Sequence, residues 1–328
     1  HMVLSRRPDD AATDPALLAA IARAQRQGLA FRVDLAPLAE DAALALARGI
    51  TMRSGVDVAS IVAEAAGVPY LVAELAHFAT GRGDQHGEPQ VGTTAGSLMN
   101  ERLRGLAPED RVLVELAALC GAAQSPTILL EAAHSRDRSR LRDLCVLRLL
   151  RWAGAGDGEA LQIYHDRLRE FVVGALSPEA AIRHHQALVV AMEATSTSDA
   201  EQMTAHALAA GDRPRTRRHA ITAARRAEAA LAFDLAARLY RTAIEHNEVD
   251  APRAELHALC AEALANAGQS TGAAPEFERA AAAIAAESPA ELDRRGFLRR
   301  RAGEQYLKAG HFEDGLRLME AFLADADV

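Results

Sequence analysis

Hydrophobic spacing divides the chain into three consecutive regions. Between residues 38 and 80, apolar side chains recur every three or four residues, which predicts three short helices ending near Gly49, Gly67 and Gly81. Residues 97–176 combine helical spacing with one alternating stretch, and from Ser177 onward the spacing is helical throughout. The pattern therefore predicts a mostly α fold, with short β-structure only near the N-terminus and in the wing of the second region.

The N-terminal 37 residues have a different pattern. Asp14 to Gly28 reads as a capped helix, and Leu29–Leu35 as a short buried strand before Pro37. Residues 81–96 are rich in glycine and polar residues without periodicity, so they predict a flexible linker.

The second region is expected to hold helices at 97–104, 108–120, 126–134 and 138–152. Gly154, Gly156 and Gly158 then form a turn into a strand that ends at Tyr164. This order of elements fits a winged helix, with 97–176 as its bounds. Winged helices often bind DNA, but the 138–152 helix is apolar over too wide an arc and offers few polar base readers, so DNA binding is not expected.

The third region contains a repeat. A small residue, a large one four positions later and a third after three more appear in three successive helices, at intervals of 37 and 42 residues. These intervals are close to the tetratricopeptide period of about 34 residues. We expect helices at 178–194 and 199–210, then helix pairs that stack into an α-solenoid. The three triplets are Ala236, Tyr240, Ala243; Ala273, Phe277, Ala280; and Gly315, Met319, Phe322.

One histidine occupies a notable position. In Leu161–Val172, a strand pattern changes to a helical pattern at His165, where a side chain can reach toward a bound anion while Asp166 caps the helix. Upstream, Gly67 and Pro69 form a Gly-x-Pro segment between two helices.

These two segments, about ninety residues apart, resemble the Met-His-Asp and Gly-x-Pro segments of STAND signalling ATPases. Val3–Asp10 is similar to the late core strand of that family, which ends in an arginine near the γ-phosphate. The resemblance implies that His165 holds the nucleotide phosphate, Pro69 packs near the adenine, and Arg7 lies near the γ-phosphate. It also implies that the full-length protein switches between ADP and ATP, with Mg as the metal.

Each of these residues also has a local explanation. His165 fits a hydrogen-bonding residue at an element boundary, Pro69 fits the first position of any helix after a turn, and Arg7 fits solvated terminal charge. The sequence leaves both interpretations open.

Composition narrows the functional classes. The 328 residues are 49% hydrophobic and only 4% aromatic, which favours close-packed helices in two or three domains. The net charge of −8 draws the chain neither to nucleic acid nor to an anionic membrane. No membrane-spanning or secretory segment is evident, and Cys120, Cys145 and Cys260 read as buried apolar residues, so we expect a cytoplasmic protein.

Catalytic and metal-binding motifs are not found in the sequence. The only lysine is Lys308, so no P-loop is present, and no zinc or nucleophile-elbow motif occurs. His184 and His185 lack the i, i+4 spacing of a helical zinc site. We expect no enzyme activity, no metal and no cofactor in this chain alone. His1 before Met2 suggests a tag remnant on a piece of a longer protein.

Taken together, the patterns predict five segments and a regulatory role. The solenoid is expected to bind a protein or small effector. Arginines that include Arg218, Arg225, Arg295 and Arg299 fit an acidic ligand. The chain would then be the partner-sensing portion of a STAND-type ATPase, in contact with its nucleotide-binding domain. The alternative is a helical-repeat scaffold with no nucleotide role. The segments are 3–37, a remnant of the nucleotide-binding core; 38–80, a helical lid; 81–96, the linker; 97–176, the winged helix; and 177–328, the repeat sensor.

Overall fold

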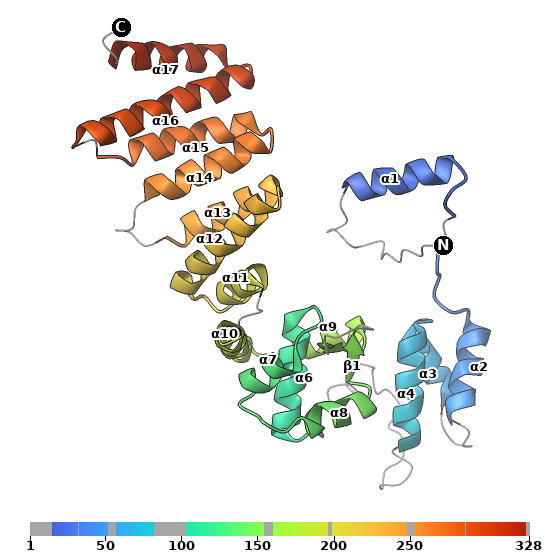
Figure 1. The fold of residues 1–328 in the computed structure, drawn as a ribbon. Coiled ribbons are helices and arrows are strands. Elements are labelled where there is room, and N and C mark those ends of the chain that lie inside the picture. The colour runs from blue at the N-terminus through green and yellow to red at the C-terminus, as the bar shows by residue number, and fades with distance from the viewer. Residues whose placement is uncertain are drawn as a thin grey trace. The chain divides into compact units, whose positions relative to one another are not determined.

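A computed structural model describes residues 15–31, 33–51, 57–81, 103–153, 160–195, 199–247, 253–285 and 287–325. Helices dominate these residues, and the two strands within them form one small sheet (Figure 1). The mostly α fold predicted from the sequence is therefore confirmed. The chain divides into two compact units, His1–Leu98 and Met99–Val328, and each is described by itself.

The described residues of the first unit form four helices: α1 (Pro15–Arg26), α2 (Glu40–Thr51), α3 (Val58–Ala65) and α4 (Pro69–Gly81). Helices α2, α3 and α4 pack on one another. Their core is small and mainly aliphatic, because the apolar residues recur at helical spacing on one side of each helix. It includes Ala43, Ala47, Ile61, Val62, Leu71, Val72, Leu75 and Ala76.

Gly67 determines how α3 is joined to α4. Its φ of +73° lies in the left-handed region that favours glycine, and its carbonyl accepts a hydrogen bond of 2.8 Å from the backbone N–H of Leu38. This bond joins the α3–α4 turn to the segment that leads into α2. At the other end of α3, the Asp57 carboxylate accepts from the backbone N–H of Ser60 and caps the helix.

Two expectations for this unit are wrong. Leu29–Leu35 forms no strand among its described residues, and Phe31 and Leu35 are 92% and 93% exposed. A strand needs a neighbour for its backbone hydrogen bonds, and this segment has none within the described part of the unit. Helix α2 also continues through Gly49 to Thr51, because Gly49 takes no left-handed conformation and helical bonding is not interrupted.

The second unit begins with α6 (Pro108–Cys120), α7 (Pro126–Ala132) and α8 (Ser139–Val146). An antiparallel hairpin of β1 (Leu150–Ala153) and β2 (Ala160–Ile163) follows, with Leu150 opposite Ile163 and Trp152 opposite Leu161. Gln124 and Leu161 exchange two backbone hydrogen bonds and extend this pairing by one isolated bridge. Helix α9 (Asp166–Ala175) begins directly after the hairpin. The glycine turn at 154–158 lies outside the described residues.

The predicted helix over 138–152 is wrong in its second half. Helix α8 ends at Val146, Arg148 adopts a left-handed φ of +55°, and the chain continues as β1. Leu149 and Leu150 are fully buried. A short apolar run fits helical and extended spacing equally well, so spacing alone did not reveal the reversal at Arg148.

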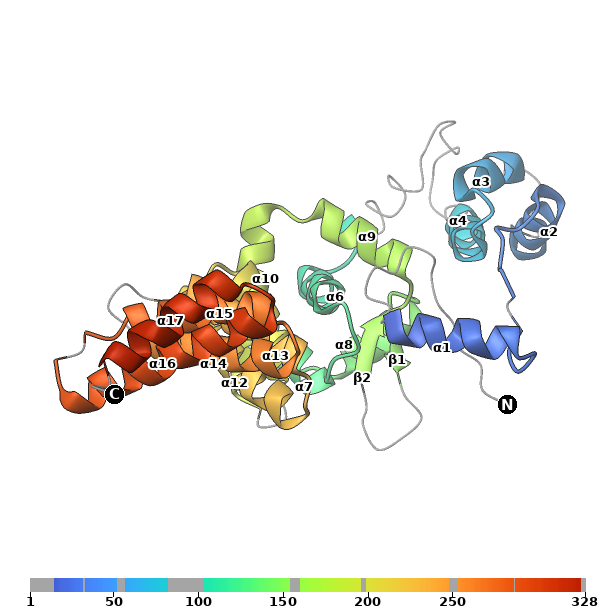
Figure 2. The same ribbon diagram turned by 90° about the horizontal axis from the view of Figure 1, so that it is seen from above.

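The rest of the unit is a solenoid of helix pairs, in which each helix packs on the next along the chain (Figures 1 and 2). Helices α12, α14 and α16 are the first helices of their pairs, and α13, α15 and α17 are the second helices. The bounds are α10 (Pro178–Glu193), α11 (Ala200–Ala209), α12 (Arg213–Ala229), α13 (Phe233–Glu245), α14 (Arg253–Asn266), α15 (Ser270–Ala282), α16 (Pro289–Lys308) and α17 (Phe312–Asp325).

The repeat triplets explain this stacking. All six residues of the triplets in α13 and α15 are fully buried, with Tyr240 and Phe277 as the largest side chains. In the third triplet, Gly315 of α17 lies close to Gly303 of α16, since a Cβ on either glycine would lie 3.2 Å from the carbonyl oxygen of the other. A Cβ on Gly315 would also lie 2.6 Å from Leu307 Cγ. Met319 and Phe322 are only half-buried. The triplet side chains are therefore fully buried in α13 and α15 but less completely buried in α17.

The three cysteines differ in burial. Cys260 is fully buried, as expected, whereas Cys120 and Cys145 are only partly buried. Burial raises the pKa of Cys120 to about 12 and that of Cys260 to about 11. Both thiols are therefore protonated at neutral pH, and the thiolate that attacks or ligates is disfavoured.

We predict that Gly67→Ala destabilises the first unit by about 2 kcal/mol, because alanine is strained at positive φ and its Cβ would lie 2.6 Å from the Leu38 carbonyl oxygen. Hydrogen exchange of the α2–α4 amides measures this change. Gly49→Ala is the matched control: its Cβ would meet nothing within 4 Å, so it should leave exchange unchanged or slow it. Equal effects of the two variants would refute the role given to Gly67.

Candidate regulatory junction around helix α10

Helix α10 connects the α6–α9 region to the solenoid. Ser177 caps it by accepting a hydrogen bond from the backbone N–H of Ala180, and Pro178 occupies its first position. It packs on α6 and α7 and also on α11. Its buried residues include Leu188, Val189, Ala191 and Met192. One helix therefore belongs to the cores of both regions.

Two adjacent histidines extend from α10 to different neighbours. Successive residues of a helix are separated by about 100° around its axis, so adjacent side chains face different elements. His184 Nε2 lies 2.8 Å from Oε2 of Glu115 on α6. The other oxygen of Glu115 accepts a 3.0 Å hydrogen bond from Arg111 Nε. Burial is the largest influence on the pKa of Glu115 and raises it, but the bonds from His184 and Arg111 outweigh burial and lower the pKa overall.

The second histidine faces the solenoid. His185 Nδ1 lies 2.9 Å from Nδ1 of His206 on α11, and the two rings are tilted with centroids 5.1 Å apart. Only one of the two facing nitrogens carries a proton in such a bond. Protonating both rings would place two N–H groups against each other in a buried interface. Burial, together with the charge of His185, lowers the pKa of His206 to about 4.

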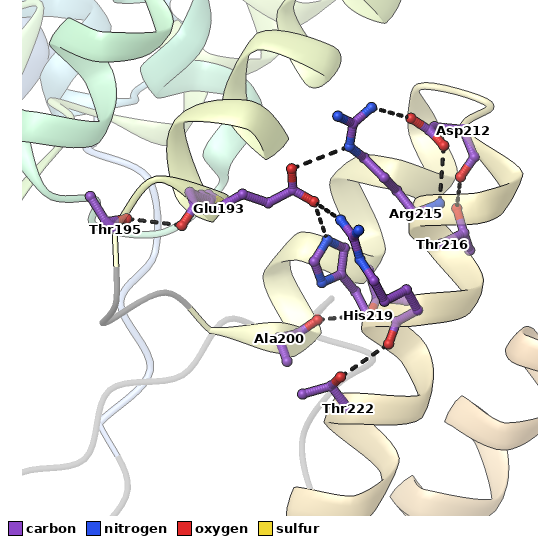
Figure 3. A network of polar contacts seen from close by, with 11 residues as sticks. Glu193, Thr195, Ala200, Asp212, Arg215, Thr216, His219 and Thr222 are labelled. Carbon is purple, nitrogen blue, oxygen red and sulfur yellow. Dashed lines mark hydrogen bonds and ion pairs between the residues drawn. The ribbon is translucent and has the colours of Figure 1, made fainter.

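At its C-terminal end, α10 reaches α12 through a single carboxylate (Figure 3). Glu193 Oε1 lies 2.8 Å from His219 Nε2 and also accepts a hydrogen bond from Arg218, while Oε2 accepts from Arg215 Nε at 3.3 Å. Arg215 also bonds to Asp212, the residue that caps α12, at 2.7 Å. Burial is the largest influence on the pKa of Glu193 and raises it, but His219 and the two arginines together lower it. Glu193 is thus held as a carboxylate between α10 and α12.

His165 lies at the predicted boundary between strand and helix. It caps the helix, which is the role expected for Asp166. His165 itself is the N-cap of α9, and Asp166 is the first residue of that helix. The Nδ1 of His165 accepts a 3.2 Å hydrogen bond from the backbone N–H of Arg167. A neutral imidazole that accepts at Nδ1 carries its proton at Nε2. The expectation that Asp166 caps α9 is therefore wrong.

The other residues of the predicted nucleotide site belong to the first unit or lie outside the described residues. Pro69 is exposed and begins α4 in the first unit, whereas His165 belongs to the second unit. Arg7 lies outside the described residues.

The four arginines predicted to bind a ligand fall into two pairs. Arg218 and Arg225 lie on α12, and Arg295 and Arg299 lie on α16, with α13 to α15 stacked between the two helices. Arg218 is bound to Glu193 and Arg225 is exposed, while the α16 arginines are half-buried. The structure thus does not bring the four together, and a ligand role for them stays a prediction.

Sequence analysis missed the residues of the junction. His184 and His185 were considered only as zinc ligands, and Glu193, Arg215 and His219 were not singled out. One available signal was the His-His pair on the first helix of the predicted repeat domain, directly after the winged helix, because adjacent side chains on a helix face different neighbours.

Two further findings concern metals and membranes. Within the described ranges, no group of three or more His, Cys, Asp or Glu side chains is placed to hold a metal ion. In the same ranges, every helix is either too short or too polar to cross a bilayer.

Comparisons with known proteins give one result. No protein-family model and no curated protein matches the chain. Among solved structures, it is similar to a Signal Transduction ATPase with Numerous Domains (STAND) protein with a tetratricopeptide repeat sensor from Pyrococcus horikoshii, with 15% sequence identity and a TM-score of 0.42. The match covers 91% of this chain and 55% of that one, so the chain spans about half the length of that protein.

We predict that acid weakens the junction through the histidine pair. The pKa of His206 is lowered in the folded state, so the unfolded chain takes up the proton first, and stability is lost as pH falls from about 6.5 toward 4. The loss amounts to at most about 3 kcal/mol. Denaturant titrations between pH 7 and 4 measure it.

The variant His206→Gln should flatten this dependence, since glutamine does not titrate. His311→Gln, which changes an exposed histidine in the turn before α17, should retain the full slope. An unchanged slope in His206→Gln would contradict the assignment.

Proposed function

We propose that the chain is the regulatory and partner-sensing portion of a STAND-type signalling ATPase and is not catalytic by itself. The observation that carries this proposal is the position of α10, which packs on α6 and α7 and is bonded to α11 and α12. An effector that shifts the first solenoid helices would also strain α10, and through it α6 and α7. In this proposal α6–α9 is a winged helix, and the solenoid is the sensor.

The order of elements supports this proposal. The packed helices α2–α4, four helices with a β-hairpin (α6–α9), and a solenoid follow one another in one chain. Solenoids commonly present extended surfaces to peptides or proteins, because each repeat adds to a continuous face. Arg225 of α12 is exposed on such a helix and is our proposed contact for an acidic effector. Arg295 and Arg299 of α16, and Arg218, which already binds Glu193, are further proposed contacts along the solenoid.

For the nucleotide, the chemistry of His165 fits the proposal. With Nδ1 used as a helix cap, the protonated Nε2 is the ring atom that would donate a hydrogen bond to a phosphate oxygen in the full-length protein. Pro69, exposed at the start of α4, would flank the adenine, and Arg7 would approach the γ-phosphate. ATP or ADP with Mg would bind mainly to a nucleotide-binding domain, which would supply the phosphate-binding loop that this sequence lacks.

The alternative is a helical-repeat scaffold with no nucleotide role. The capping bond of His165 favours it, because that bond explains the histidine without any ligand. The two functions differ in what they require of the ring: a cap needs only an acceptor, whereas a phosphate contact needs the Nε2 donor.

This difference defines the test, which uses the full-length protein. His165→Asn keeps an acceptor at a position where asparagine is a good helix cap, but it removes the Nε2–H donor. We predict that His165→Asn and His165→Ala both lose retained ADP and raise basal signalling, and that only His165→Ala also destabilises α9, by about 1 kcal/mol. Nucleotide content after purification and thermal unfolding measure the two effects.

If His165→Asn retained ADP and signalled like the unmodified protein, the nucleotide role would be wrong and the scaffold function would stand. Asp143→Asn, an exposed change on α8, serves as the control for nonspecific effects of substitution.

A further inference from the structure

Helix α12 concentrates positive charge in a chain that is acidic overall. Its 17 residues include six arginines and one glutamate, a net charge of +5, whereas the whole chain carries −8. The first turn of α12 holds Arg213 and Arg215 and no acidic residue. Backbone N–H groups already make this end of a helix positive, so the dipole disfavours arginines there and favours an anion. The N-terminal half of α12 therefore attracts negative charge.

One side chain from another helix supplies that charge. Glu193 Oε1 lies 2.8 Å from His219 Nε2 and also accepts a hydrogen bond from Arg218. Its Oε2 accepts from Arg215 Nε at 3.3 Å (Figure 3). Charge-assisted N–H···O bonds are usually about 2.7–2.9 Å long. Three donors thus share two oxygens, one of them at a long distance, and a single carboxylate satisfies the cluster incompletely.

Glu193 also lies at an unfavourable position on its own helix. It is the last residue of α10, where the helix dipole is negative and disfavours a carboxylate. Solvent reaches both sides of the contact: the side chains of Arg215 and Arg218 are 39% and 61% exposed, and that of Glu193 is 24% exposed. An anion from solution can therefore reach the arginines, and its binding would release Glu193 from the end of α10.

We propose that Arg215, Arg218 and His219 form a binding site for the phosphate group of a small-molecule effector, and that Glu193 occupies this site as an internal competitor. A phosphate group offers each of the three donors an oxygen of its own, and it carries more charge than a carboxylate. The planar guanidinium of arginine matches the geometry of phosphate oxygens. The phosphate group would take the place of the Glu193 carboxylate between α10 and α12.

The neighbouring charges set the direction from which the ligand binds. Asp212 accepts a 2.7 Å hydrogen bond from Arg215 Nη1 and caps α12, so it holds that guanidinium while leaving Nε to face Glu193. Arg225 is exposed and follows Arg218 by seven residues, which is about two helical turns. It extends the positive surface along α12, so a second negative group on the effector would strengthen binding.

Replacement of Glu193 would link ligand binding to the junction, because Glu193 carries the bonds between α10 and α12 that cross the junction. A bound phosphate would loosen α10 from α12. This consequence rests on the sensing role proposed above, whereas the phosphate site does not. Its test involves no nucleotide and leaves His165 unchanged, so failure here and failure of the nucleotide role are distinguishable.

The test uses the full 328-residue chain with inorganic phosphate as the probe. Isothermal titration calorimetry at pH 7.5, in phosphate-free buffer of low ionic strength, measures the affinity. Glu193→Ala removes the competitor, and apparent affinity rises with the fraction of molecules whose site is vacant. We expect this variant to bind phosphate about tenfold more tightly than the unmodified chain, and Arg218→Gln added to it to abolish the gain. Phosphate should also raise the melting temperature of Glu193→Ala.

The matched control is Glu170→Ala on α9. It removes one negative charge and frees the exposed Arg167 from an ion pair of 2.8 Å, so nonspecific attraction of phosphate would appear in it equally. We expect it to bind phosphate like the unmodified chain. Glu193→Gln, which removes the charge but keeps the size of the side chain, provides a second variant if Glu193→Ala misfolds, as judged by circular dichroism. It should also bind phosphate more tightly.

Four outcomes would overturn the proposal. The first is equal phosphate affinity of Glu193→Ala and the unmodified chain, and the second is an equal gain in Glu170→Ala. The third is a gain that persists when Arg218→Gln is added. Acetate serves as a second probe and gives the fourth outcome: if it binds Glu193→Ala as tightly as phosphate does, the assignment of the site to a phosphate group is wrong.

Discussion

The fold of the second unit depends on a helix that is shared between two cores. Helix α10 must bury one side against α6 and α7 and another against α11, so its polar side chains need partners on both sides. His184, His185 and Glu193 meet this constraint, with bonds to Glu115, His206 and His219. Loss of one partner would leave a buried or half-buried polar group unsatisfied, which costs more than the bond itself contributes.

The shared helix connects the solenoid mechanically to the α6–α9 region, because α10 packs on α6, α7 and α11. Each later helix contacts mainly its sequence neighbours, so a disturbance in a repeat passes from pair to pair. At α12 it meets Glu193, a carboxylate held by two arginines and a histidine. Because α10 carries that carboxylate, a shift of α12 changes the forces on α10. This mechanical link underlies the proposed sensing role, whatever effector the repeats bind.

Much of the fold could be predicted from the sequence, because helical spacing and capping residues are local signals. The helices over 178–194 and 199–210 appear as α10 and α11 with ends within one residue. Three features could not be predicted for physical reasons. Leu29–Leu35 has a strand pattern but no pairing neighbour among the residues that the structure describes. Arg148 reverses the chain inside an apolar run, and Glu193 finds its cations only when α10 and α12 are folded together.

The most direct measurement of the central claim, that α10 acts as one unit linking both regions, is a double-mutant cycle between Glu115→Gln and Glu193→Gln. Glu115 bonds to His184 of α10, whereas Glu193 belongs to α10 itself, nine residues further on and so about 14 Å along the helix axis. Independent sites at such a separation have additive effects on the free energy of unfolding, within about 0.3–0.5 kcal/mol. A shared rigid helix predicts a larger coupling energy in denaturant titrations of the four proteins. Additive effects would contradict the claim.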